Sequence, residues 1–372
     1  MLNPTPYRPA VRALAAATVL TLLCLVAVGG TVTSHDAGMA VPDGFTTFGH
    51  WSLTAPLSLW WHNFNTFIEH SHRVLGYVAG WFAIALAVVL AVTQHGRPWL
   101  RWSGVVLLLC VIGQGILGIL RVDQISYTLA GIHGVTGQMI LWLAFLIALA
   151  CGPWWVRRVQ EGRRLGLRKV PWSAWLVLLL LLLQLGLGSG VRHSQSALAI
   201  PDWPLHYGKL LPPMDQAGID AAAAKVMDPA ARAVTVGEAQ REAFDPDGDG
   251  TYAAWQVHLQ FTHRLGAYVT TAVILGFVVF WWVRVSAARV PLALMSVLLA
   301  AQVTLGVMTV LSGESATYAT MHQTCGAVLG LTAVAAAVRV TLGARLTRPL
   351  PAGAASQSGI DADLRPGSRV PA

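Results

Sequence analysis

Four histidines stand inside strongly apolar stretches of the chain, where an ionisable side chain is costly and marks a candidate functional site. They are His72, His133, His263 and His322. Each lies near the start of its stretch, and the spacing within the first pair is close to that within the second. Two imidazoles supplied by two helices are the arrangement that ligates a heme iron on both faces. The four residues therefore predict two bis-histidine heme sites at matching depths.

Other roles for these histidines are less favoured. A single histidine at a membrane interface is more often a hydrogen-bonded side chain than a ligand, but four in register favour iron ligation. Neutral imidazole also binds zinc. Zinc sites use three or four protein ligands, however, and no cysteine or carboxylate completes a second pair here. Four further histidines are interpreted mainly as loop residues: His35, His70, His193 and His258.

One carboxylate distinguishes the two pairs. Glu69 stands three residues before His72, whereas Gln260 occupies the matching position before His263. Residues three apart share a helical face, so we expect Glu69 to point toward whatever His72 ligates. A carboxylate there can act as a general base or stabilise a cation that develops at a heme edge, and a glutamine can do neither. The alternative is a solvated glutamate at a helix N-terminus, where negative charge is favourable.

An arginine follows the first histidine of each pair. These residues, Arg73 and Arg264, need a partner for their charge. A heme propionate near the membrane interface would provide one, and a lipid phosphate reached by snorkelling would provide another. Arg121, at the end of another apolar stretch, has the same two interpretations. The sequence leaves this choice open.

Helices that cross a bilayer must position these residues. The chain has 372 residues, of which 55% are hydrophobic and 11% charged, against about 25% charged in a soluble domain. This composition excludes a soluble enzyme, a disordered chain and a fibrous protein. Eight stretches are long enough to span a bilayer, which takes about 20 apolar residues. They run over 12–31, 65–93, 103–121, 128–151, 172–191, 255–283, 291–312 and 318–342.

The basic residues between the spans predict the orientation of the chain. They are concentrated in the loop 152–171 and in two further loops on the same side, whereas 32–64 and 313–317 contain no Lys or Arg. Basic loops stay in the cytoplasm, so both termini are predicted to be cytoplasmic and loops 32–64 and 192–254 external. The histidines then lie toward the outer face. The formal net charge of +8 reflects this orientation and does not indicate a nucleic-acid partner.

Internal repetition predicts how the spans are arranged. The Ala-Val-Pro-Asp run at 40–43 recurs as Ala-Ile-Pro-Asp at 199–202, and Ser-His-Arg at 71–73 recurs as Thr-His-Arg at 262–264. Two further features recur in the same order: Gln114 to Gly118 with Gln302 to Gly306, and His133 with His322. Such repetition marks a duplicated unit. We therefore predict an all-α integral membrane protein with eight transmembrane helices, arranged as two pseudo-symmetric four-helix bundles.

These motifs resemble those of the heme A synthase family. The resemblance is carried by the Glu-His-Ser-His-Arg run at 69–73, the Phe-Thr-His-Arg run at 261–264, and His133 and His322, and it extends over roughly residues 12–342, duplication included. Members of this family have eight transmembrane helices and convert heme O to heme A. They oxidise a porphyrin methyl group to a formyl group through successive hydroxylations.

The resemblance implies a role for each site residue. The substrate heme O would bind between His72 and His133, with Glu69 as the essential acidic residue, and a heme b cofactor would bind between His263 and His322. Arg73 would then contact the substrate heme, and Arg264 the cofactor heme. The repeat and the composition predict three domains: 1–160 (N-terminal bundle), 161–343 (C-terminal bundle, with an external insertion near 213–254) and 344–372 (disordered cytoplasmic tail). The resemblance assigns the substrate heme and catalysis to the first and heme b to the second.

The resemblance also implies a cellular setting. Heme O synthase would supply the substrate, terminal oxidase assembly would use the product, and a membrane or periplasmic redox carrier would exchange electrons. The protein would be a multi-pass protein of the cell (inner) membrane. Some family members carry a cysteine pair in an external loop, whereas all cysteines here lie in or beside apolar stretches, so no such pair is predicted. They are Cys24, Cys110, Cys151 and Cys325.

Two other functions were weighed against this one. A non-catalytic di-heme cytochrome b would explain the four histidines, but it gives no reason for Glu69 to lack a counterpart. It would also be expected to place hemes toward both faces of the membrane. A transporter with an internal repeat is disfavoured because the spans lack paired centres interrupted by glycine and proline.

Overall fold

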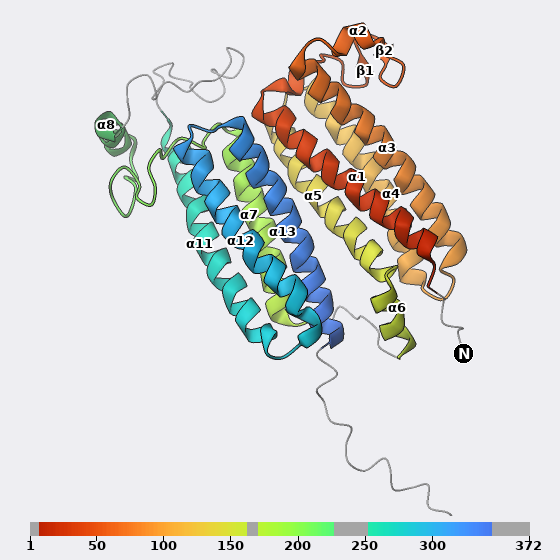
Figure 1. The fold of residues 1–372 in the computed structure, drawn as a ribbon. Helices are drawn as coiled ribbons and strands as arrows, with labels where there is room; N and C mark the ends of the chain where they lie inside the picture. The colour runs from red at the N-terminus through yellow and green to blue at the C-terminus, as the bar shows by residue number, and fades with distance from the viewer. Residues whose placement is uncertain (1–6, 162–169, 227–251, 344–372) are drawn as a thin grey trace, which may run out of the picture.

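The computed structural model describes residues 7–161, 170–226 and 252–343. Within them, the predicted spans form eight helices that are long and apolar enough to cross a membrane (Figure 1). These are α1 (Pro9–Ser34), α3 (Phe64–Thr93), α4 (Pro98–Asp123), α5 (Tyr127–Ala150), α7 (Trp172–His193), α11 (Ala254–Trp282), α12 (Arg289–Leu311) and α13 (Ala316–Gly343). The prediction of an all-helical integral membrane protein with eight spans is confirmed.

Helices α1 and α4 begin several residues before the predicted spans 12–31 and 103–121, because their first turns contain residues that are not apolar. Pro9 and Pro98 lie in the first turn of α1 and α4, where the missing N–H of proline would have no helical partner. The side chain of Asn63 caps α3, and that of Ser126 caps α5. Each cap satisfies backbone N–H groups that the helix itself cannot pair.

Shorter elements occupy the connections. The first long loop, residues 35–63, contains η1 (Ala37–Met39), the antiparallel strands β1 (Thr46–Thr47) and β2 (His50–Trp51), and α2 (Leu57–Trp60). The second long loop, residues 194–253, contains α8 (Gln216–Val226), and residues 227–251 of its predicted insertion lie outside the described residues. The predicted tail, 344–372, also lies outside them. The remaining short helices are α6 (Pro153–Gln160) and η3 (Ser286–Ala288).

The long helices form two groups of four (Figure 1). In the N-terminal group, α1, α3, α4 and α5, each helix packs against the next and α5 returns to α1. The C-terminal group, α7, α11, α12 and α13, follows the same pattern. The groups meet through α1 and α5 on one side and α7 and α13 on the other. The predicted pseudo-symmetry between them stays a prediction.

The last helix, α13, lies at the centre of this arrangement. Of its most apolar stretch 72% is buried, against 11% for α4. Its buried residues include Ala327, Gly330, Ala333, Ala336 and Ala337. Small residues let helix backbones approach closely, which is how helices gain packing energy in a membrane.

Polar side chains join the two groups near the end that carries the long loops. The hydroxyls of Ser34 on α1 and Thr320 on α13 lie 2.8 Å apart, and Ser189 on α7 donates to the carbonyl of Gly131 on α5 at 3.0 Å. We call these four residues the polar seam. In lipid, hydrogen bonds between helices add to van der Waals packing in holding them together.

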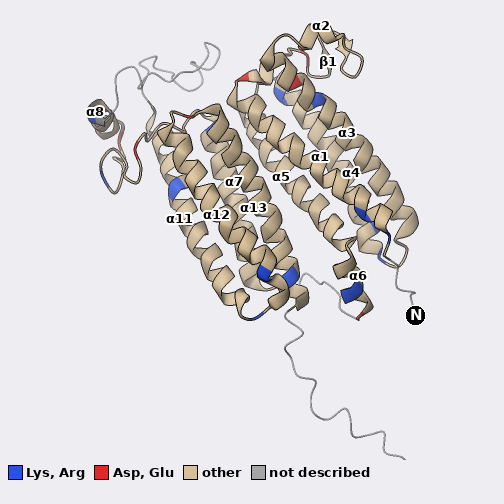
Figure 2. Cartoon of the chain, viewed as in Figure 1, with Lys and Arg blue, Asp and Glu red and all other residues tan. Residues whose placement is uncertain are grey.

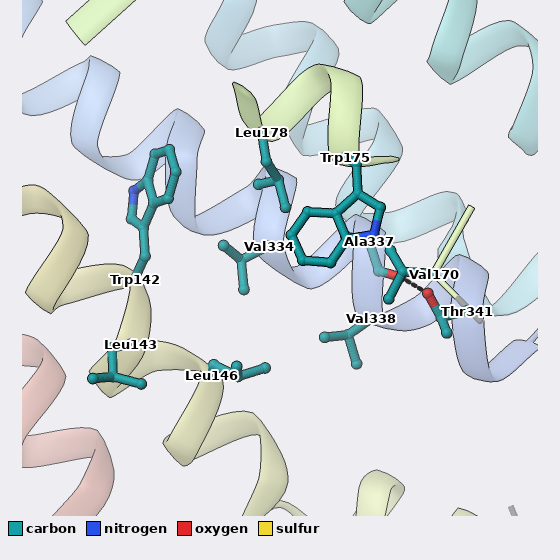
Figure 3. A pocket seen from close by; sticks show the side chains of 10 residues that line it. All are labelled: Trp142, Leu143, Leu146, Val170, Trp175, Leu178, Val334, Ala337, Val338 and Thr341. Atoms are coloured by element: carbon teal, nitrogen blue, oxygen red, sulfur yellow. Dashed lines mark hydrogen bonds between the residues drawn. The ribbon is translucent and has the colours of Figure 1, made fainter. Parts of the chain in front are cut away.

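An apolar cavity of about 200 Å³ opens between the same helices at their other end (Figure 3). The only hydroxyl on its lining belongs to Thr341, and it donates to the carbonyl of Ala337 at 2.6 Å. Charged residues lie toward the ends of the helices and not along their middles (Figure 2). The cavity offers no side chain suited to chemistry, which directs attention to the end with the long loops. Its larger lining residues are Trp142, Leu146, Trp175, Leu178, Val334 and Val338.

Candidate functional site

The structure brings the predicted histidines together in pairs. His72 of α3 and His133 of α5 lie close enough to interact electrostatically, and so do His263 of α11 and His322 of α13. All four lie in the half of their helix that begins at the long-loop end. We call the surroundings of the first pair the N-terminal site and those of the second pair the C-terminal site.

Each histidine ring packs against a glycine on the preceding long helix. A Cβ atom built on any of these glycines would come closer to Cε1 of the histidine than the 3.4–4 Å of ordinary contact. The pairs and their distances are Gly29–His72 (3.1 Å), Gly118–His133 (3.1 Å), Gly188–His263 (3.0 Å) and Gly306–His322 (2.9 Å). A larger residue would therefore displace the ring, so the four glycines fix where the imidazoles lie.

Glutamines support the histidine-bearing helices. Gln114 donates to the backbone carbonyl of His133 at 2.6 Å, and Gln184 donates to that of His263 at 2.8 Å. Each glutamine stands four residues before the glycine that contacts the same histidine, so one face of one helix provides both contacts. These hydrogen bonds fix the position of α4 along α5, and of α7 along α11.

The residues of the N-terminal site fit a heme. The Nδ1 atoms of His72 and His133 are buried and lie beside the backbone of Leu25 on α1 and of Gln114 on α4, respectively. With Nδ1 directed at a backbone carbonyl, Nε2 is the ring nitrogen that would bind a metal. Two facing imidazoles suit the axial positions of a heme iron. Zinc has no comparable site, because no group of three or more His, Cys, Asp or Glu side chains forms within the described chain.

Glu69 is buried in the N-terminal site, with 2% of its surface exposed. This excludes the alternative of a solvated glutamate. Its Oε2 accepts the backbone N–H of Val41 at 2.7 Å, and its Oε1 accepts from Nη2 of Arg73 at 2.8 Å. The carboxylate thus holds part of the first long loop against α3, one helical turn before His72.

Gln260 performs the same task in the C-terminal group. It is also 2% exposed. Its Oε1 accepts the backbone N–H of Ile200, and its Nε2 donates to the carbonyl of Ala197. A neutral amide is therefore sufficient to hold a long loop at this position. The negative charge of Glu69 is not required for that contact.

Arg73 and Arg264 also hold the long loops. Arg73 donates to the carbonyl of Val41 at 3.0 Å, and Arg264 donates to those of Ile200 at 2.6 Å and Asp202 at 2.8 Å. The sequence predicts a heme propionate or a lipid phosphate as the partner of each arginine, and it does not predict these loop carbonyls. The way in which the loops fold back onto the helices cannot be read from the sequence. A direct contact of either arginine with heme stays a prediction.

The two long loops share backbone details beyond these contacts. Asp43 accepts the N–H of Gly49 at 2.7 Å, and Asp202 accepts that of Gly208 at 2.8 Å. The two glycines have φ values of +78° and +73°, a region that favours glycine because it has no Cβ. The loops therefore turn in the same way, on equivalent carboxylates.

Acid is expected to weaken the first long loop through Asp43. Hydrogen bonds from the Gly49 N–H and the Thr46 hydroxyl lower the pKa of Asp43 from its usual 3.8. A lowered pKa in the folded state means that the carboxylate stabilises the protein above the unfolded value, and that this contribution disappears as the pH falls through the folded value. We expect the difference in Tm between wild type and Asp43→Asn to be present at neutral pH and to shrink as the pH falls below 3.8. A difference that stays constant through acid would contradict this prediction.

Three histidines interpreted as loop residues lie in helices instead. His70 and His258 belong to α3 and α11, inside the predicted spans 65–93 and 255–283, and His193 is the last residue of α7, just beyond the predicted span 172–191. The ring of His70 stacks on Trp60 with centroids 4.2 Å apart. The loop interpretation of these three residues was wrong.

The glycine contacts were missed by sequence reasoning, although part of their signal was present. The Gln-x-x-x-Gly pattern of α4 and α12 was recognised as a repeat without a role. The same pattern occurs on α7 as Gln184 to Gly188 and marks the third contact. On α1 the matching position is Leu25, so the pattern gives no signal for Gly29.

Comparisons with known proteins place the chain among related sequences. A family model described as a cytochrome oxidase assembly protein, COX15-CtaA, matches residues 1–146 and 57–334. A heme A synthase from Symbiobacterium thermophilum is 26% identical over 217 residues, which cover 55% of this chain and 66% of that protein. A heme A synthase from Listeria welshimeri is 26% identical over 149 residues, or 39% of this chain and 48% of that protein.

The matched segments span less than two thirds of the length of each of these curated relatives. The region that the family model matches, in contrast, covers most of the chain, and the four histidines and Glu69 lie within that region. The chain therefore belongs to the COX15-CtaA family of cytochrome oxidase assembly proteins.

Proposed function

We propose that this protein is a heme A synthase, which oxidises a methyl group of heme O to a formyl group and so supplies heme A to terminal oxidases. Membership of the COX15-CtaA family and similarity to two heme A synthases support this activity. The proposal gives the two sites different tasks: the N-terminal site binds and transforms heme O, and the C-terminal site holds heme b.

The difference between Glu69 and Gln260 carries the proposal. Both side chains are buried, and both hold a long loop through a backbone N–H. Since the amide does this without charge, the carboxylate of Glu69 must have another reason to be buried at a cost in desolvation. A reacting group beside one heme and not the other supplies that reason.

The histidines would bind the two irons. His72 and His133 would hold heme O, and His263 and His322 would hold heme b. Heme iron supplies one-electron redox chemistry when it is bound. The chain supplies geometry: the four glycines set the positions of the imidazoles, and the glutamines fix the helices that carry them.

Glu69 is held ready to act on the substrate. Hydrogen bonds from Val41 and Arg73 restrain both carboxylate oxygens, so the group cannot rotate freely. Each oxygen keeps a further lone pair. It can therefore accept a proton from the reacting carbon or stabilise positive charge that develops at the porphyrin edge.

The proposal retains the predicted organisation and setting. The two helix groups would be pseudo-symmetric domains with boundaries near 1–160 and 161–343, which the matching loop turns and glycine–histidine contacts support. Both termini would be cytoplasmic, and the heme sites would face the outside. Heme O synthase would deliver the substrate, and a membrane or periplasmic redox carrier would exchange electrons.

Glu69→Gln tests the proposed activity. Because Gln260 already holds a loop in the same way, the variant should fold and retain its hemes. Loss of a positioned acid or base lowers rates by about 100- to 10,000-fold, so we expect heme O to accumulate and heme A to disappear. Pigment extracted from membranes and separated by chromatography measures both.

The control variant Glu161→Gln removes an exposed carboxylate just after α6 and should leave heme A formation unchanged. A normal yield of heme A from Glu69→Gln would remove Glu69 from the mechanism. Purified wild-type protein that carries two hemes but forms no heme A from heme O would refute the synthase. That result would instead support an electron-transfer cytochrome b.

A further inference from the structure

Most buried arginines near the histidines form hydrogen bonds to other protein groups. Arg73 bonds to Glu69 and to carbonyls of the first long loop, and Arg264 bonds to carbonyls of the second. Arg192 of α7 donates to the carbonyl of Gly30 at 3.0 Å across the interface between the helix groups. These three guanidiniums serve the fold.

Arg121 is different. It lies in the last turn of α4, three residues beyond Gly118, and so shares the face of α4 that touches His133. Its guanidinium packs against Gly38 of η1, where an added Cβ would lie 3.0 Å from Nη1. Its charge acts on Glu69 and on the imidazoles of the N-terminal site. Arg121 therefore faces the N-terminal site.

The donors of Arg121 have no protein partner. The guanidinium is partly buried, yet it makes no hydrogen bond to another residue in the part of the chain that the structure describes. An arginine presents a planar fork of N–H groups that matches a carboxylate in two parallel hydrogen bonds. A partly buried fork without a partner is suited to an anionic ligand.

The C-terminal group has no cation at the position equivalent to Arg121. The residue three beyond Gly306 is Thr309, and its hydroxyl donates to the carbonyl of Leu305 at 2.8 Å. The N-terminal site thus contains a carboxylate and an arginine where the C-terminal site has Gln260 and Thr309. Arg121 is not needed to neutralise Glu69, because Arg73 already forms an ion pair with Glu69 at 2.8 Å.

We propose that Arg121 binds a propionate carboxylate of the porphyrin in the N-terminal site and so orients the substrate there. The proposal rests on the proposed function, since it takes a heme as the ligand of this site. The sequence left open which of Arg73, Arg121 and Arg264 contacts a propionate. The proposal assigns this role to Arg121, whose N–H donors have no partner among the described residues.

Binding of two porphyrins that differ only in charge tests the proposal. The probes are iron mesoporphyrin IX and its dimethyl ester, titrated by absorbance into purified His263→Ala/His322→Ala protein, in which only the N-terminal site has its histidines. Loss of a charge-assisted bidentate pair should make Arg121→Gln bind the free acid about 10- to 100-fold more weakly. Its affinity for the dimethyl ester should not change.

Two controls separate this effect from general damage. Arg339→Gln removes an arginine that packs over Trp154 at the other end of α13, and it should leave both affinities unchanged. Arg121→Gln in a His72→Ala/His133→Ala background should not alter binding at the C-terminal site. Arg121→Lys should recover part of the preference for the free acid.

Four outcomes would overturn the proposal. Equal weakening of both porphyrins by Arg121→Gln would mean that Arg121 supports the fold, and no change in either would mean that it has no part in binding. Recovery of free-acid affinity in Glu69→Gln/Arg121→Gln would mean that Arg121 only balances Glu69. If the His263→Ala/His322→Ala protein binds neither probe while the His72→Ala/His133→Ala protein binds both, the N-terminal heme site itself is wrong.

Discussion

Replacement of Gly188 by valine is expected to weaken the heme binding proposed for the C-terminal site. A Cβ at this position would lie 3.0 Å from Cε1 of His263, and the two methyl groups of valine would press further on the ring. The displaced ring would lose its contact with Gln184, whose Nε2 lies 3.0 Å from Nδ1. Overpacking of this kind costs about 1–3 kcal/mol, which corresponds to about 5- to 150-fold in heme affinity.

The same helix provides the matched control for this substitution. Gly186 has no atom within 4 Å of its added Cβ, so Gly186→Val changes helix propensity and volume equally without touching the histidine. The low-spin heme absorbance of the two purified variants measures the effect. Equal heme content in both would show that close approach to the ring does not govern binding.

Removal of Arg73 is expected to destabilise the protein more than removal of Arg264. Arg73→Ala leaves the carboxylate of Glu69 buried, at 2% exposure, without its ion pair. Breaking a buried pair in this way costs about 3–5 kcal/mol, because the remaining charge is left uncompensated. Arg264→Ala strands no buried carboxylate, since Gln260 is neutral and the less buried Asp202 keeps its hydrogen bonds from Tyr207 and Gly208. It should cost about 1–3 kcal/mol in lost hydrogen bonds.

The free energy of unfolding in mixed micelles, compared across the two variants, checks this difference. The double variant Glu69→Gln/Arg73→Ala should recover most of the loss, because an amide replaces the stranded carboxylate. If the double variant is no more stable than Arg73→Ala, the charge of Glu69 is not what makes Arg73 necessary.

The spans and the histidine pairs could be predicted because both depend on patterns local in sequence. Apolar stretches define helices in lipid whatever they pack against, and repeated motifs place the histidines at equivalent depths. The contrast between Glu69 and Gln260 could be read from the same repeat, but the repeat left open whether Glu69 is buried or solvated.

The partners of the arginines could not be predicted because they depend on how the long loops return onto the helices. Val41 lies about thirty residues before Arg73 in the chain, and nothing local indicates that its carbonyl and the Arg73 guanidinium meet. The contacts between glycines and histidine rings could not be predicted either, since a glycine in an apolar span indicates only a weak helix former. Only the neighbouring helix shows that the missing Cβ makes room for an imidazole.

The interface between the two helix groups is uneven along its length. The polar seam fastens the long-loop end, whereas the cavity of about 200 Å³ leaves the other end with fewer packed atoms. Side chains that line a void lose dispersion contacts on one side, so the resistance to shear is lower there. If one group rocks against the other, the pivot should therefore lie at the polar seam. The N-terminal and C-terminal sites lie toward the same end, so the distance between them should change least during such a motion.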